Sequence, residues 1–191
     1  MRKLRYAYYL LADPSEPRLL RDETCWLFPE HITIRGRFLA SPSKVADLVI
    51  AGREVFRTLA PFTAELHGPR VFASGLSWYE LREESAALPA IRSIHRHLDR
   101  ELRDRGLLLD DEVPASHSGE LYKPHMTLSF RRLAPEQLQS YPATVRVPFV
   151  EWGLFRYDGW PSRPKLRCVF GEHLYGRTTA RPFTSAKPAW I

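Results

Sequence analysis

The sequence is poor in cysteine and lysine, and it contains no long hydrophobic run. Its two cysteines, Cys25 and Cys168, lie far apart with no Cys-x-x-Cys or Cys/His spacing, which argues against a disulfide scaffold and a structural zinc site. No apolar stretch has the length of a transmembrane helix. The short run from Leu4 to Ala12 lacks a cleavage site of small residues. We therefore expect a soluble, cytoplasmic protein that does not bind membranes.

Several motifs of nucleotide-dependent and hydrolytic enzymes are also missing. The chain has no Gly-x-Gly-x-x-Gly, no Walker-type Gly-Lys and no Gly-x-Ser-x-Gly, so dinucleotide, nucleoside triphosphate and serine hydrolase functions have no support. His95 and His97 fall on an expected helix, where residues two apart point about 200° away from each other. We expect this pair on the solvated surface. The sequence predicts no metal site and no cofactor.

The charge of the chain is carried mainly by arginine. Of 191 residues, 28 are basic and 22 acidic, which gives a formal charge of +6, and only five of the basic residues are lysine. Arginine is suited to bidentate contacts with phosphate, so this excess favours a polyanionic partner. The alternative is that it reflects the base composition of the genome. The 44% hydrophobic content allows a sizeable core in one domain or two small lobes.

The most informative feature that is present is a duplicated tetrapeptide, His-x-Thr-aliphatic. It occurs as His31-Ile32-Thr33-Ile34 and again as His125-Met126-Thr127-Leu128. Alternate side chains of a strand point to opposite faces, so each copy directs its His and its Thr to the same face. A single copy would be read as an ordinary strand histidine. Two copies on neighbouring strands would place two imidazoles and two hydroxyls around one phosphodiester.

These four side chains suit acid/base catalysis. Histidine has an unperturbed pKa near 6.5, so one imidazole can accept a proton while the other donates one. We expect His31 and His125 to be catalytic, and Thr33 and Thr127 to bind the phosphate oxygens where charge builds up in the transition state. The sequence alone does not distinguish the acid from the base, because the two motifs are nearly symmetric.

Basic and aromatic residues near the motifs are candidates for binding the rest of the substrate. By strand alternation, Arg35 shares the face of His31, and Arg131 shares the face of the second motif. Tyr122 and Lys123 lead directly into that motif. We predict these four as substrate-binding residues. The alternative for each is a solvated position at a strand end.

Hydrophobic periodicity predicts an approximately repeated order of elements in the two halves of the chain. The expected strands cover residues 4–12, 31–38, 62–66, 71–81, 145–157 and 166–170, with a further strand from Pro124 and a turn at His67-Gly68-Pro69. The expected helices lie between Ser41 and Pro61, between Leu88 and Gly106, and from Pro135.

The two motifs, 94 residues apart (125 − 31), resemble those of the 2H phosphoesterase superfamily, which includes 2′,5′ RNA ligase-like proteins and RNA 2′,3′-cyclic phosphodiesterases. The stretch from His31 to Phe38 is similar to the first motif of bacterial members. The second motif departs from the RNA-ligase type, because Ser129-Phe130 precedes Arg131 where a small residue and then Arg often follow. The resemblance implies an α+β fold with two pseudo-symmetric lobes of antiparallel sheet and outer helices around a central cleft. Residues 1–191 would form this single domain, with one motif in each lobe.

The resemblance also implies an activity. It suggests a metal-independent cyclic phosphodiesterase acting on 2′,3′-cyclic phosphates at RNA ends or in nucleotides, with His31 as proton donor and His125 activating water. The same groups could join a cyclic end to a 5′-hydroxyl without ATP, since microscopic reversibility keeps the participants unchanged. Two alternatives stay open: a phosphodiesterase for a small cyclic phosphate other than RNA, and a non-catalytic RNA-binding protein of the same fold. We expect a monomer whose partner is an RNA end or a cyclic nucleotide.

Overall fold

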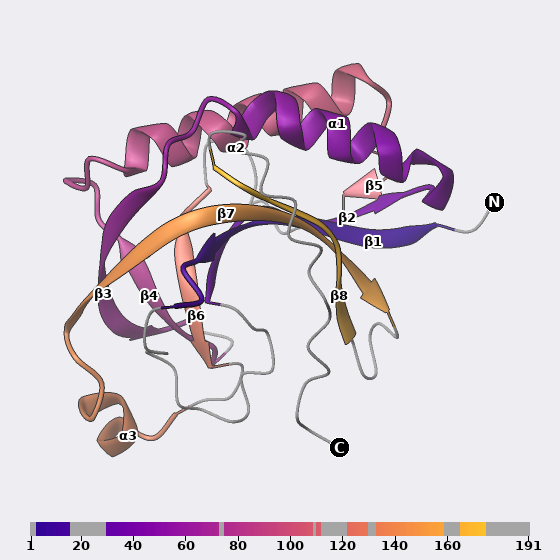
Figure 1. Cartoon of the computed structure of the whole chain (residues 1–191). Coiled ribbons are helices and arrows are strands. Elements are labelled where there is room, and N and C mark those ends of the chain that lie inside the picture. Colours follow the sequence, from indigo (N-terminus) through magenta and orange to yellow (C-terminus); the bar gives the residue numbers. More distant parts are fainter. Residues whose placement is uncertain are drawn as a thin grey trace.

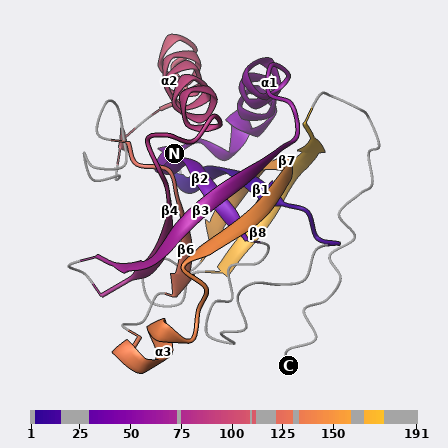
Figure 2. The ribbon, with the colours of Figure 1, turned by 90° about the vertical axis from the view of Figure 1, so that its left-hand side faces the viewer.

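The computed structural model describes residues 3–15, 30–72, 75–108, 110–111, 122–129, 133–158 and 165–174, and the structural statements below concern these residues. Antiparallel strands form one strongly curved sheet, and two long helices lie side by side over one of its faces (Figure 1; Figure 2). This is the α+β arrangement of antiparallel sheet with outer helices that the sequence predicts. Among the described residues, no helix has the length and hydrophobicity of a membrane span.

The elements follow the predicted order. The strands are β1 (Leu4–Ala12), β2 (His31–Ala40), β3 (Phe62–Val71), β4 (Ser77–Leu81), β5 (Asp110–Asp111), β6 (His125–Ser129), β7 (Thr144–Asp158) and β8 (Lys165–His173). The helices are η1 (Pro42–Lys44), α1 (Val45–Phe56), α2 (Leu88–Asp104) and α3 (Pro135–Gln139). Helix α2 forms because apolar residues recur at helical spacing along its buried face. It ends where Gly106 adopts a φ of +61°.

The sheet has two halves that meet at the motif strands. Its strand order is β1-β2-β6-β4-β3-β7-β8, with β5 on β2 and a further pairing between β1 and β7. The long strand β7 belongs to both halves, because its first part pairs with β3 and its later part pairs with β1 and β8. Strands β2 and β6 pair at Ile32 and Met126. The two motifs therefore lie on neighbouring strands.

The main core lies between the sheet and the helices. The aliphatic residues of both motifs, Ile32, Ile34, Met126 and Leu128, are completely buried in it. Because side chains alternate along a strand, the His and Thr of each motif point to the other face of the sheet. We call this other face, which carries His31, Thr33, His125 and Thr127, the motif face.

One predicted turn is wrong. Strand β3 continues through His67-Gly68-Pro69, and the turn to β4 comes later, where the Phe72 N–H donates to the Leu76 carbonyl at 2.9 Å and Gly75 has a φ of +88°. Gly68 and Pro69 fall where the pairing of β3 with β4 shifts register. Sheets tolerate Gly and Pro at such irregularities, so these residues do not end the strand.

His95 is buried, and the prediction of a solvated histidine is wrong. Its side chain is 1% exposed, and its Nδ1 lies 2.6 Å from the Ile34 carbonyl of β2. A carbonyl only accepts, so Nδ1 carries a proton and donates it. The ring also stacks on Tyr122 at 4.0 Å between centroids. His95 thereby joins α2 to the first motif strand, and burial lowers its pKa.

The lowered pKa of His95 predicts that the protein loses stability in acid. The folded state keeps this imidazole neutral, whereas in the unfolded chain it takes up a proton below a pH of about 6.5. The free energy of unfolding should therefore fall as the pH is lowered from about 7.5 to about 5.5. Denaturant titrations at both pH values should show a smaller fall in His95→Gln, whose side chain does not titrate. An equal fall in both proteins would show that other groups cause the acid sensitivity.

Candidate active site

The register of β2 and β6 brings the two motifs together. With Ile32 opposite Met126 in an antiparallel pair, His31 falls opposite Thr127 and Thr33 falls opposite His125. Each histidine thus faces the threonine of the other motif. The two histidines lie on a diagonal of the pair, where residues are typically roughly 7–8 Å apart and their Cβ atoms somewhat closer. A single phosphate group bound between the two histidines could therefore contact both imidazole side chains.

His31 is the first residue of β2, and its ring packs against a tyrosine of β1. Its side chain is 8% exposed, and its ring centroid is 4.3 Å from that of Tyr9 on β1. The Tyr9 hydroxyl is hydrogen-bonded to the hydroxyl of Tyr157. Burial raises the pKa of both tyrosines, and the positive charge of Arg37 opposes this effect. Two neutral phenols and one nearby cation therefore make up this side of the site.

His125 begins β6 and is half-buried. Its Nδ1 lies 2.8 Å from the carbonyl of Lys123, so Nδ1 donates and the neutral ring carries its lone pair on Nε2. The ring also meets Trp78 edge-on at 5.5 Å and Phe72 at 5.4 Å. Phe72 in turn stacks on Trp78 at 4.5 Å. The backbone and two aromatic rings together fix the orientation and tautomer of this imidazole.

The two motif threonines are half-buried on the same face. Their hydroxyls can each donate a hydrogen bond to an added anion. The backbone of Thr33 is fixed by a hydrogen bond, because its carbonyl accepts from the Tyr122 hydroxyl at 2.7 Å. Thr127 lies opposite Trp78 on β4.

Arg35 does not lie on the face of His31, and this part of the sequence prediction is wrong. The pairing of β1 with β2 shifts register on both sides of Tyr8, and Arg35 is the residue opposite Tyr8. Alternation therefore fails before Arg35, which turns toward the helices. It is completely buried, and its Nε lies 3.0 Å from a carboxylate oxygen of Asp99 on α2. The arginine whose positive charge opposes the burial-induced rise in the pKa of Tyr9 and Tyr157 beside His31 is Arg37.

The other predicted substrate-binding residues have different positions. Tyr122 is 4% exposed and is occupied by His95 and the Thr33 carbonyl, so it supports β2 and is not placed to contact a substrate. Lys123 is exposed beside the second motif. Arg131 lies outside the described residues.

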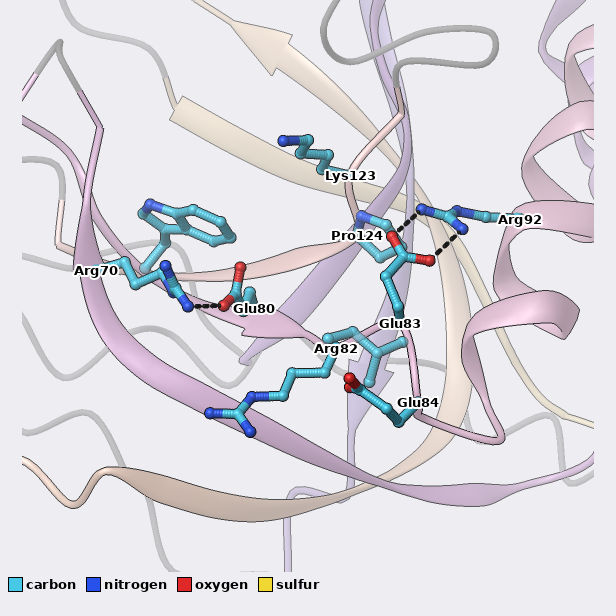
Figure 3. A pocket seen from close by; sticks show the side chains of 10 residues that line it. Arg70, Glu80, Arg82, Glu83, Glu84, Arg92, Lys123 and Pro124 are labelled. Carbon is cyan, nitrogen blue, oxygen red and sulfur yellow. Dashed lines mark hydrogen bonds and ion pairs between the residues drawn. The ribbon is translucent and has the colours of Figure 1, made fainter.

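A pocket of about 300 Å³ opens next to the second motif (Figure 3). Trp78, Glu80, Lys123 and Pro124 are among its lining residues. Two ion pairs lie in it, one between Arg70 and Glu80 and one between Arg92 and Glu83. In the second pair, hydrogen bonds from Arg92 lower the pKa of Glu83. Sequence reasoning missed Glu80, although its position between the apolar residues Tyr79 and Leu81 on a strand could have placed it on the motif face.

The described residues contain no group of three or more His, Cys, Asp or Glu side chains arranged to hold a metal ion.

Comparisons with known proteins agree with this architecture. The sequence signature of the 2′-5′ RNA ligase superfamily matches residues 17–159. The fold is similar to that of Escherichia coli LigT complexed with 3′-AMP, with a TM-score of 0.58 and 16% identity over 91% of this chain and 99% of that one. The protein TT0787 of Thermus thermophilus gives a TM-score of 0.58 with 21% identity over 91% of this chain and 100% of that one. A protein described as a phosphoesterase gives 0.57 with 17% identity over 91% and 99%. No curated protein matches the chain significantly.

Proposed function

Because the chain belongs to the 2′-5′ RNA ligase superfamily of 2H phosphoesterases, we propose that it hydrolyses 2′,3′-cyclic phosphodiesters at RNA ends or in nucleotides without a metal ion. The observation that supports this most directly is the pairing of β2 with β6, which puts both His/Thr pairs on one face. Escherichia coli LigT has been crystallised with 3′-AMP and with phosphate. Ligands of this chemistry suit the four side chains described here.

The proposed reaction needs two proton transfers. His125 Nε2 takes a proton from water, whose oxygen attacks phosphorus, and the bond from phosphorus to one ribose oxygen breaks. His31 gives a proton to that leaving oxygen, so the product is a phosphate monoester. Thr33 and Thr127 donate to the non-bridging oxygens as charge accumulates. The assignment of acid and base follows the family resemblance, and the Nδ1–H tautomer of His125 supports its role as base.

The remaining parts of the proposal concern the substrate. Lys123 is exposed and lines the pocket next to the second motif, and it is proposed to hold a further phosphate or ribose group. Arg131, two residues beyond the motif strand, is proposed to share that role. We propose that residues 1–191 act as one two-lobed domain, and that ligation of a cyclic end to a 5′-hydroxyl is the reverse of the same reaction.

The function is tested by a turnover screen of cyclic mononucleotides and cyclic-ended oligonucleotides, with EDTA present throughout. We expect turnover to persist after exhaustive chelation, because the proposed mechanism uses two histidines and no metal-bound water. The pH profile of kcat/KM should be bell-shaped, since one histidine must be neutral and the other protonated. Activity that disappears on chelation and returns with a divalent ion would contradict the mechanism.

A small cyclic phosphate other than RNA is a second candidate substrate. Two observations favour it: Arg35 is turned away from the motif face, and the pocket combines four basic with three acidic side chains. Salt dependence decides between the candidates. Binding of a cyclic-ended oligonucleotide along a basic track should weaken with salt, with a slope of about −0.7 per phosphate neutralised, whereas a mononucleotide should show little slope. Equal salt dependence for both ligands would reject the RNA-end substrate.

A further inference from the structure

His125 lies in a row of polar side chains that crosses the second half of the sheet. Glu80 of β4 pairs directly with His125, and on its other side Glu80 pairs with His67 of β3. These positions share the motif face, because their strand neighbours Tyr79, Leu81 and Met126 are buried in the core on the opposite face. Directly opposite residues of an antiparallel pair have Cβ atoms about 4.5–5.5 Å apart. A carboxylate is therefore the cross-strand neighbour of the second motif histidine.

The Glu80 carboxylate is held in place beside the histidine. It forms an ion pair with Arg70 of β3 (Figure 3), and its side chain is 23% exposed while that of Arg70 is 55% exposed. Arg70 approaches from the β3 side, opposite to β6. Glu80, and not Arg70, is the member of this pair that sits on the strand next to His125 and directly opposite it.

The surroundings of His31 are different. The residue of β1 that pairs with His31 is Leu11, which is apolar and buried. Its ring contacts the neutral Tyr9. The two motif histidines, equivalent in the sequence, therefore differ in their cross-strand neighbour, which is a carboxylate for one and a leucine for the other.

We propose that Glu80, held by Arg70, is a positioning residue that stabilises the protonated form of His125 when this imidazole takes the proton from the attacking water. The proton passes from the water oxygen to Nε2 of His125, and Glu80 gains and loses none. An opposite charge on the directly paired residue lowers the cost of forming the imidazolium. This role rests on the proposed function for the reaction step, but the charge coupling itself is measurable without turnover.

Among the described residues, further charged and titratable groups near His125 lie on its own segment, on β3 and on β2. Lys123 precedes it on its own segment, and its exposed side chain is one of those that line the pocket (Figure 3). On β3, His67 lies behind Glu80 and is paired with Glu65 at 3.2 Å. From β2 the opposite residue is the uncharged Thr33, and His31 is diagonal. Glu80 is the carboxylate among them that pairs directly with His125.

The test is an NMR titration of His125 in the full chain, carried out in wild type, Glu80→Gln and Arg70→Gln. Removing the carboxylate leaves Arg70 alone, so the His125 titration midpoint should fall by about half a unit to one unit. Removing the guanidinium leaves Glu80 alone, so the midpoint should rise. Glu83→Gln is the matched control, because it breaks the second ion pair of the same pocket without changing a neighbour of His125, and it should leave the midpoint in place.

The pH dependence of turnover should change in the same direction as the titration midpoint of His125. In Glu80→Gln the acidic limb of kcat/KM should move to lower pH, and kcat should fall about fivefold to tenfold with KM nearly unchanged. An unmoved midpoint in Glu80→Gln, or shifts of the same sign in Glu80→Gln and Arg70→Gln, would overturn the inference even if the wild type turns over cyclic phosphates. Opposite shifts in a protein without any such turnover would instead uphold the charge coupling and reject the proposed function.

Discussion

Replacing either motif histidine by alanine is expected to lower kcat by roughly a hundredfold to ten-thousandfold, the usual contribution of one general acid or base. His31→Ala removes the proposed donor to the leaving oxygen, and His125→Ala removes the proposed acceptor of the water proton. Because the two act in one reaction step, the double variant should lose much less than the product of the single losses. Initial rates on a cyclic mononucleotide at saturating substrate measure all three variants.

A histidine outside the motifs provides the control. His173 on β8 is partly exposed and forms an ion pair with Glu151 at 3.1 Å, so His173→Ala changes a surface histidine without touching β2 or β6. It should keep wild-type turnover. Thermal unfolding of each variant shows whether the fold survives. Turnover near that of wild type in His31→Ala or His125→Ala would remove that residue from the proposed mechanism.

The features that local patterns determine could be predicted from the sequence. The apolar run of β1, the amphipathic helix α2 and the short helix α3 all form where periodicity places them. The alternation of His31, Ile32 and Thr33 also correctly predicts that the aliphatic motif residues enter the core while the polar ones point away. A motif of four residues is short enough for strand alternation to hold throughout it.

Alternation fails over longer distances, and this explains the errors in the candidate site. The irregular pairing around Tyr8 turns Arg35 to the helix side. Gly36, a glycine inside the strand, is compatible with such an irregularity but does not say which side chains it redirects. Tyr122 and His95 are polar residues that are buried against each other, since their rings stack across a separation of 27 residues in the chain (122 − 95). Glu80 becomes a neighbour of His125 only through strand pairing. These positions depend on tertiary contacts that a single sequence does not display.

The correction at Arg35 leads to a large expected effect on stability. Asp99→Ala should lower the free energy of unfolding by about 3 kcal/mol, because it removes the carboxylate that faces a completely buried guanidinium. Breaking one side of a buried ion pair typically costs about 3–5 kcal/mol, and the lower end applies here since the Asp99 side chain is 21% exposed. Denaturant unfolding of the purified variant at neutral pH measures this loss.

Arg35→Met tests whether the stability loss in Asp99→Ala comes from leaving a buried charge unpaired or only from the lost contact. Methionine keeps much of the side-chain volume without a charge, so this variant should lose less stability than Asp99→Ala, and adding Asp99→Ala to it should cost little more. Since Arg35 faces α2 and not the motif face, Arg35→Met should also keep kcat and KM within about twofold of wild type. A large rise in KM with unchanged stability would restore Arg35 to the substrate site. Fully additive stability losses would show that Arg35 and Asp99 do not act as a pair.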